Sequence, residues 1–194
     1  MKIISWNIRG MCSSVKKRYV SSIIKEQKPD IIFIQETKLE QLDSFQIKKM
    51  WYDSEVQVES VNAEGLSGGL LSMWNAQMFK AEEVILNRRF ILIRGTFSDN
   101  FPCVILNIYA PNDMTARRAL WNEILALKLR FSDPWCMGGD FNEIKEVNER
   151  IGCVRLDRGM QDFQEFINNL EMQDLPVIGF SAALVSPDPS PSQL

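Results

Sequence analysis

Short apolar segments alternate with amphipathic ones along the chain. KIISW (residues 2–6) predicts a strand, and DIIFIQ (30–35) is an uninterrupted apolar run, typical of a strand covered on both faces. Between them, residues 14–27 carry apolar side chains at helical spacing. These apolar positions are Val15, Tyr19, Ile23 and Ile24. The chain is therefore expected to open with the order strand, helix, strand.

The middle of the chain is rich in β-branched and aromatic residues separated by turn residues, which predicts a meander of antiparallel strands. The expected strands cover residues 55–61, 68–74, 82–87, 89–97 and 102–110. Two further helices are expected at about 115–129 and 159–171, with the strand PWCMGG between them. This mixed order predicts an α/β (α+β) sandwich, with two mixed, largely antiparallel β-sheets face to face and flanking helices.

Composition and charge narrow the range of partners. The 194 residues are 45% hydrophobic and 24% charged, with a net charge of −3, which is ordinary for a soluble globular domain. Without an overall excess of Lys and Arg, nucleic-acid binding would need a local basic patch. We find no signal peptide or transmembrane segment, so we expect an intracellular protein, in the nucleus or cytoplasm, with no membrane partner. The sequence leaves the oligomeric state open.

The cysteines and the histidine count limit the chemistry further. The four cysteines, Cys12, Cys103, Cys136 and Cys153, form no C-x-x-C pair, so we expect free thiols in a reducing compartment. The sequence contains no histidine, which removes the commonest general base and the usual catalytic triads, and argues against zinc.

Polar side chains follow four of the predicted apolar strands. They are Asn7, Glu36, Tyr109 with Asn112, and Asp140 with Asn142. Asn and Asp at strand ends are common turn formers, but Glu is a poor turn residue, and a carboxylate beside IIFIQ risks desolvation. If these strand ends meet at one rim of a sheet, their oxygens would suit Mg²⁺ and would not suit zinc or copper.

Two glycine pairs accompany these polar positions. Gly138 and Gly139 precede Asp140 and would let the backbone bend and another chain segment or a substrate come close. Gly68 and Gly69 are expected to allow close packing or a turn rather than a substrate contact.

Four motifs occur in the order SWNIRG, IQETK, NIYAPN and GGDFNEI. Together they resemble the endonuclease/exonuclease/phosphatase superfamily, which has the deoxyribonuclease-I-like fold. GLSGGLLSMW (65–74) and residues 148–179 resemble the endonuclease domain of plant non-LTR (LINE-type) retrotransposons. The resemblance implies one domain over residues 1–180. Residues 181–194 are rich in Pro and Ser and are expected to form a disordered tail.

The resemblance implies metal-assisted hydrolysis of DNA phosphodiester bonds, with Mg²⁺ or, in its place, Mn²⁺. Glu36 would be the principal metal ligand, and Asn7 would support the metal and the phosphate. Tyr109 would reach a phosphate oxygen, and Asn142 would donate to the scissile phosphate. Asp140 would orient and deprotonate the attacking water.

Basic and aromatic residues give weaker expectations. A local DNA-facing patch is predicted at Lys145, Arg150, Arg155 and Arg158, with a solvated run of surface charge as the alternative. Lys38 could approach a phosphate or remain solvated. Core positions are expected for Trp51, Trp74, Trp121 and Trp135.

The C-terminal part departs from the family pattern. Members of the family carry further strands with a Trp, a Ser and an Asp, and then a Ser-Asp-His; this chain follows the family through DLPVIGF (174–180) and continues as SAALVSPDPSPSQL. Without any histidine we expect a weakened metal site, since each lost charge-stabilising donor costs about 10²–10³ in rate.

We expect a truncated endonuclease-like domain of retrotransposon origin, inactive alone. An active Mg²⁺-dependent nuclease or phosphatase completed by a partner, and a non-catalytic nucleic-acid or protein-binding module, are the alternatives.

Overall fold

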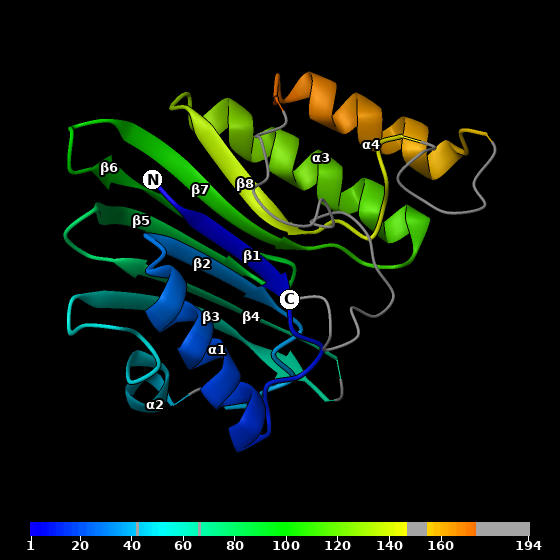
Figure 1. Cartoon of the computed structure of the whole chain (residues 1–194). Helices are drawn as coiled ribbons and strands as arrows, with labels where there is room; N and C mark the ends of the chain where they lie inside the picture. Colours follow the sequence, from blue (N-terminus) through cyan, green and yellow to red (C-terminus); the bar gives the residue numbers. More distant parts are fainter. Residues whose placement is uncertain (42, 66, 147–154, 174–194) are drawn as a thin grey trace. The chain divides into compact units, whose positions relative to one another are not determined.

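The computed structural model of the chain describes residues 1–41, 43–65, 67–146 and 155–173, and Figure 1 labels its elements. The strands are β1 (Ile3–Asn7), β2 (Ile31–Gln35), β3 (Val56–Glu64), β4 (Ser67–Asn75), β5 (Phe79–Asn87), β6 (Phe90–Phe97), β7 (Pro102–Tyr109) and β8 (Trp135–Asp140). The helices are α1 (Ser14–Gln27), α2 (Ser44–Lys48), α3 (Met114–Arg130) and α4 (Arg158–Asn169).

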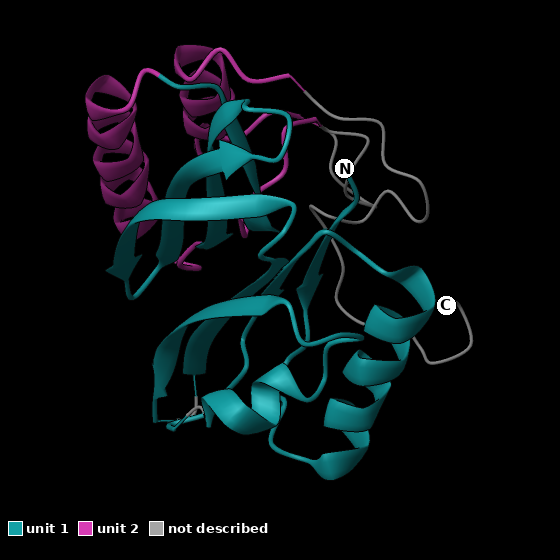
Figure 2. Ribbon diagram, turned by 90° about the vertical axis from the view of Figure 1, so that its left-hand side faces the viewer, with its two compact units in different colours: residues 1–109, 133–140 teal, residues 110–132, 141–194 magenta. Residues whose placement is uncertain are grey.

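The chain divides into two compact units, which Figure 2 colours separately. Unit 1 comprises residues 1–109 and 133–140, and unit 2 comprises residues 110–132 and 141–194. Of the elements that the structure describes, β1 to β8 with α1 and α2 belong to unit 1, whereas α3 and α4 belong to unit 2.

The strands of unit 1 form two four-stranded sheets built on the same plan. The first sheet has the order β1-β2-β4-β3, and the second has the order β5-β6-β7-β8. Each sheet has one outer pair that is parallel, β1 with β2 and β7 with β8, while the other neighbouring strands are antiparallel. The predicted pair of mixed, largely antiparallel sheets is therefore confirmed. A parallel pair needs a crossover in the chain, and α1 and α3 are the helices found in these two connections.

An apolar layer joins the two sheets face to face. Its buried members alternate along the strands, because successive side chains of a strand point to opposite faces. From the first sheet they include Ile31, Phe33, Leu70 and Trp74, and from the second sheet Phe79, Ile91, Ile93 and Ile105. Burial of large apolar side chains of this kind is the main force that holds a sandwich together.

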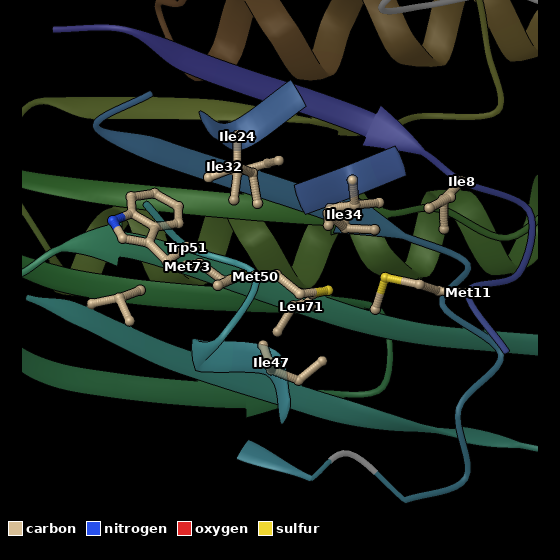
Figure 3. Close-up of a cluster of buried hydrophobic side chains, with 12 residues drawn as sticks. Ile8, Met11, Ile24, Ile32, Ile34, Ile47, Met50, Trp51, Leu71 and Met73 are labelled. Carbon is tan, nitrogen blue, oxygen red and sulfur yellow. The ribbon is translucent and has the colours of Figure 1, made fainter. Parts of the chain in front are cut away.

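A second apolar cluster lies on the outer face of the first sheet, where α1 and α2 cover it (Figure 3). Ile32 and Ile34 of β2 pack there with Ile24 of α1 and Ile47 of α2. Because Ile31 and Phe33 face the other cluster, β2 is buried on both faces, as its uninterrupted apolar sequence predicts.

The apolar stripe predicted for α1 is partly wrong. Val15 is 64% exposed and Tyr19 is 41% exposed, and the fully buried positions are Val20 and Ile24. The stripe through Val20 and Ile24, one position further along the helix, faces the core, and the Tyr19 ring packs edge-on against Trp6 with the ring centroids 5.7 Å apart. Spacing alone marks an apolar stripe but does not decide which of two adjacent stripes meets the sheet.

Unit 2 is organised around an aromatic cluster between α3 and α4. The Trp121 ring stacks on Phe166 with the centroids 4.4 Å apart and also contacts Phe141 and Phe163. Asp113 caps α3, since its side chain accepts a hydrogen bond from the backbone N–H of Ala116 at 2.8 Å. Within the described ranges, no helix combines the length and apolar character required to span a bilayer.

Candidate functional site

Four of the predicted site residues lie at the C-terminal ends of the two parallel strand pairs in unit 1. Asn7 ends β1 and Glu36 directly follows β2, while Tyr109 ends β7 and Asp140 ends β8. The strand registers pair Asn7 with Gln35 and Tyr109 with Asp140. Parallel strands bring their carboxyl ends to the same edge of a sheet, which is the usual place for a ligand site. We refer to Asn7, Glu36, Tyr109 and Asp140 as the rim.

Asn7 connects the two carboxylates of the rim. Its side-chain Nδ2 donates to Glu36 Oε1 at 2.9 Å and to Asp140 Oδ2 at 2.5 Å. Its Oδ1 accepts a hydrogen bond from the backbone N–H of Arg9 at 3.0 Å. The amide therefore presents its NH₂ group to the acids, and a carboxylate from each sheet lies within hydrogen-bond distance of one nitrogen atom.

Tyr109 contributes a buried phenol to the rim. Burial raises the pKa of Tyr109, and the negative charge of Glu36, a side-chain hydrogen bond with Glu36, and the charge of Asp140 raise it further. The phenol therefore stays protonated at neutral pH. In this state it is a hydrogen-bond donor, and it is not a phenolate nucleophile.

The loop after β2 is held in an unusual backbone conformation. Glu36 has φ 53° and Lys38 has φ 55°, both in the left-handed region that side chains with a Cβ rarely adopt. The backbone N–H of Thr37 donates to the carbonyl of Gly69 at 3.1 Å. A Cβ on Gly69 would lie 2.2 Å from Thr37 Oγ1, so the glycine permits this close packing, as predicted.

The glycine pair before Asp140 serves the same purpose at the end of β8. A Cβ on Gly139 would lie 2.0 Å from the backbone oxygen of Ile108 on β7. A Cβ on Gly138 would lie 3.3 Å from Phe33 Cδ2 and 3.4 Å from Ser5 Cβ, both in the first sheet. The predicted close approach of another chain segment is confirmed: Gly138 lets the first sheet come close to β8, and Gly139 lets the β7 backbone come close.

The oxygens of the rim fit a hard cation. Mg²⁺ is commonly held by one or two carboxylates with water completing its shell, and Glu36 and Asp140 supply two. Asn7 Oδ1 accepts one hydrogen bond, from the backbone N–H of Arg9, and Asn7 Nδ2 donates to both carboxylates; the predicted support of the metal by Asn7 stays a prediction. Lys38 Nζ lies 3.8 Å from Glu36 Oε2. In the part of the chain that the structure describes, no group of three or more Asp, Glu, Cys or His side chains is arranged to hold a metal ion.

Asn142 lies in unit 2, in a loop held by a buried ion pair. Its Nδ2 donates to the carbonyl of Ala110 at 2.6 Å. Arg117 donates to the carbonyl of Asn112 at 2.6 Å and, through Nη2, to Glu143 Oε2 at 2.6 Å. Arg117 and Glu143 thus tie the two motif loops of unit 2 together. The sequence gives them no role, because an Arg in an amphipathic helix and a Glu after a turn are ordinary surface residues.

The predicted DNA-facing patch is only partly within the described residues. Arg155 and Arg158 are exposed, Lys145 is half-buried with its carbonyl accepting from Gln164 at 2.7 Å, and Arg150 lies outside the described residues. A role in binding DNA stays a prediction.

Other side chains singled out in the sequence are structural. The four tryptophans predicted as core, Trp51, Trp74, Trp121 and Trp135, are all buried. Cys12, Cys103 and Cys136 are free thiols, and burial raises the pKa of Cys136. Cys153 and the predicted tail, residues 181–194, lie outside the described residues.

Comparison with known proteins places this chain in one family. Residues 4–157 match the Endonuclease/Exonuclease/phosphatase family, and the chain belongs to it. An AP endonuclease from Archaeoglobus fulgidus superposes with a TM-score of 0.68 at 17% identity, over 87% of this chain and 70% of that one. The 3′ phosphatase NExo from Neisseria, bound to a product DNA hairpin, superposes with a TM-score of 0.66 at 19% identity, over 87% and 71% of the two chains.

A third structural neighbour is TDP2 from Caenorhabditis elegans, with a TM-score of 0.57 at 20% identity. The match covers 74% of this chain and 48% of that one, so this chain spans about half the length of that enzyme. At these identities the likeness concerns the fold, which is the deoxyribonuclease-I-like α/β sandwich.

Proposed function

We propose that the rim is a divalent-metal and phosphate site of the kind that hydrolyses DNA phosphodiester bonds, and that these 194 residues do not cleave DNA on their own. The observation that carries the site is the Asn7 amide bonded to both Glu36 and Asp140. This contact brings together, from the two sheets, the Glu36 carboxylate that would bind the metal and the Asp140 carboxylate that would activate water. The family membership of residues 4–157 supports the same chemistry.

Each rim residue has a definite part in this proposal. Asp140 would accept the proton of the attacking water, and the protonated Tyr109 would donate to a phosphate oxygen. Asn7 would hold the two carboxylates in place, and Glu36 would hold the metal together with Asp140. A bound Mg²⁺ would supply charge neutralisation at the phosphate. Donation by Asn142 to the scissile phosphate stays a prediction, since Asn142 belongs to unit 2 and its Nδ2 donates to the carbonyl of Ala110.

The proposal of inactivity rests on the absence of histidine from the 194 residues. The resemblance of the motifs implies a final Asp-His pair that faces the scissile phosphate in the family. Loss of one such group typically removes about 10²–10³ of the rate. The retained rim would then bind a cation and a phosphate more readily than it would turn over a substrate.

We further propose that the chain derives from the endonuclease of a plant LINE-type retrotransposon. The support is the similarity of residues 65–74 and 148–179 to such domains. A mobile element leaves copies, so a genomic survey with the coding sequence of residues 65–179 tests this origin. Dispersed, multiple copies are expected, whereas a single-copy gene in all sampled plant genomes would contradict it.

Two measurements test the function. Binding of Mn²⁺, followed by electron paramagnetic resonance, should weaken at least about tenfold in Glu36→Gln, because a carboxylate ligand is lost. The same change at the exposed Glu26 on α1 is the matched control and should leave binding unchanged. Equal Mn²⁺ affinity for the wild type and Glu36→Gln would overturn the metal site.

A plasmid-nicking assay in Mg²⁺ or Mn²⁺ tests inactivity. We expect no nicking above that of an Asp140→Asn variant. Nicking that disappears with EDTA and in Glu36→Gln would show a working nuclease and overturn the proposal of inactivity. Retention of DNA in the presence of EDTA, without nicking, would instead favour a non-catalytic binding module.

A further inference from the structure

Three polar side chains interrupt the apolar layer between the two sheets. Gln35, Ser72 and Asn107 are each at most 1% exposed. They continue rows of side chains that are otherwise apolar, since Gln35 follows Ile31 and Phe33 on β2, and Asn107 follows Cys103 and Ile105 on β7. An apolar residue at these positions would be the simplest way to fill the layer.

These side chains form a hydrogen-bond junction between the sheets. Gln35 Nε2 on β2 donates to Asn107 Oδ1 on β7 at 2.7 Å. Asn107 Nδ2 then donates to the carbonyl of Leu71 at 3.0 Å and to Ser72 Oγ at 3.2 Å, both on β4. Each of these three bonds crosses from one sheet to the other, and Gln35 Nε2 also donates to Ser5 Oγ within the first sheet at 3.3 Å.

Hydrogen bonds of this kind fix the position of one sheet relative to the other, which apolar packing leaves free. Apolar contacts are non-directional and tolerate small sliding movements of one sheet over the other. A hydrogen bond weakens steeply when its distance and angle change, and in a buried site no water replaces it. The junction therefore favours a single register between the sheets.

The junction lies directly below the rim. Gln35 is the residue before Glu36 and pairs with Asn7 in the register of β1 and β2. Asn107 and Tyr109 are two residues apart on β7, so their side chains share one face. The rim itself is made of contacts between the sheets, Asn7 with Asp140 and Glu36 with Tyr109, so a slide at the junction would separate those partners.

We propose that Gln35 and Asn107 are positioning residues, whose buried bond sets the register of the two sheets and thereby holds Asn7 and Glu36 against Asp140. Neither residue touches a metal or substrate in this proposal. The metal-binding consequence rests on the proposed function of the rim, but the geometric claim does not.

The test replaces the junction by apolar side chains of similar shape, in the triple variant Gln35→Met/Ser72→Ala/Asn107→Leu. The three junction side chains are exchanged together, so no donor of the junction is stranded; of their other partners, the Leu71 carbonyl and the half-buried Ser5 hydroxyl each lose one bond. The sandwich is therefore expected to fold with a urea midpoint close to that of the wild type. The matched control is Ile105→Val, which trims the same layer of β7 without removal of a hydrogen bond.

Two readouts are taken from each folded variant. The first is the side-chain NH₂ signal of Asn7 in a ¹⁵N-correlated NMR spectrum of the metal-free protein, assigned by its loss in Asn7→Asp. This signal reports the bonds to Glu36 and Asp140 directly. The second is Mn²⁺ affinity, which should fall about 10–100-fold when groups that orient the ligands are lost.

A shifted or averaged Asn7 signal in the triple variant, with the signal unchanged in Ile105→Val, is the expected result. An unchanged Asn7 signal in the folded triple variant would overturn the proposal. If the wild type binds no Mn²⁺ but the Asn7 signal shifts, the proposed function fails while the positioning role stands. If the triple variant does not fold, the single variant Ser72→Ala takes its place, because it removes only one junction bond. The Asn7 signal should then shift by less than in a variant that loses the whole junction. An unchanged Asn7 signal in Ser72→Ala would count against the proposal.

Discussion

Two buried polar clusters support the motif loops, and they differ in charge. In unit 1 the junction of Gln35, Ser72 and Asn107 is neutral, and its bonds link strands. In unit 2 the pair of Arg117, 8% exposed, and Glu143, 4% exposed, is ionic, and its bonds reach the backbone of the loop before α3. Removal of one partner strands a neutral polar group in the first cluster and a charge in the second, and a stranded buried charge costs more free energy. Loss of one partner should therefore lower the free energy of unfolding by different amounts in the two clusters.

The largest effect should come from division of the ion pair. Arg117→Met leaves the Glu143 carboxylate buried without its cation and should lower the free energy of unfolding by about 3–5 kcal/mol in urea denaturation. The double variant Arg117→Met/Glu143→Leu removes both charges and should recover most of this loss. A cost below about 1 kcal/mol for the single variant would show that the pair is not effectively buried.

Division of the neutral junction should cost less. Asn107→Leu removes the 2.7 Å acceptor of Gln35 Nε2 and leaves it only the 3.3 Å bond to Ser5 Oγ, and the loss of a buried hydrogen-bond partner costs about 1–3 kcal/mol. The comparison of the free energies of unfolding, measured under the same conditions, is the test. A cost for Asn107→Leu as large as that for Arg117→Met would remove the distinction between the two clusters.

Gly159 leaves room for the Glu143 carboxylate of the ion pair, and its substitution should have an intermediate to small effect on stability. A Cβ on Gly159 would lie 2.3 Å from Glu143 Oε2, so Gly159→Ala should displace the carboxylate. Overpacking costs about 1–3 kcal/mol, and the better helix propensity of Ala returns up to about 1 kcal/mol, so a net loss of about 1–2 kcal/mol is expected by thermal unfolding. Gln161→Ala, at an exposed position of α4, is the control and should be neutral or slightly stabilising.

The smallest effect concerns a partly buried carboxylate. Burial raises the pKa of Glu59, so its folded-state pKa lies above the unfolded value of about 4.3. Its contribution to stability is then fully present below pH 4.3 and is lost as the pH rises through the folded-state pKa. Glu59→Gln should be more stable than the wild type at pH 7, by less than about 0.5 kcal/mol because solvent screens the site, and the gain should vanish in acid. Glu55→Gln, at an exposed position, should show no such pH dependence.

The sequence predicts the sandwich from local signals, because alternation and turn residues mark the strands. The rim residues were named from the resemblance of the four motifs, and the parallel pairs that bring Asn7 near Glu36 and Tyr109 near Asp140 appear only in the structure. The supporting clusters were not predicted. Gln35 and Asn107 adjoin motif positions and read as surface polar residues, and only the tertiary fold buries them. The error at Val15 and Tyr19 has the same origin, since only the tertiary fold decides which side of α1 is buried.

The left-handed backbone at the site has a consequence for laboratory evolution. Arg9, Glu36 and Lys38 all have positive φ, in the loops that follow β1 and β2. A residue with a Cβ pays roughly 1 kcal/mol to adopt that conformation, and glycine does not. A library selected for heat resistance alone should therefore enrich glycine at these positions and discard the charged side chains. Conversely, selection for cation binding should restore Glu36 against this thermal advantage.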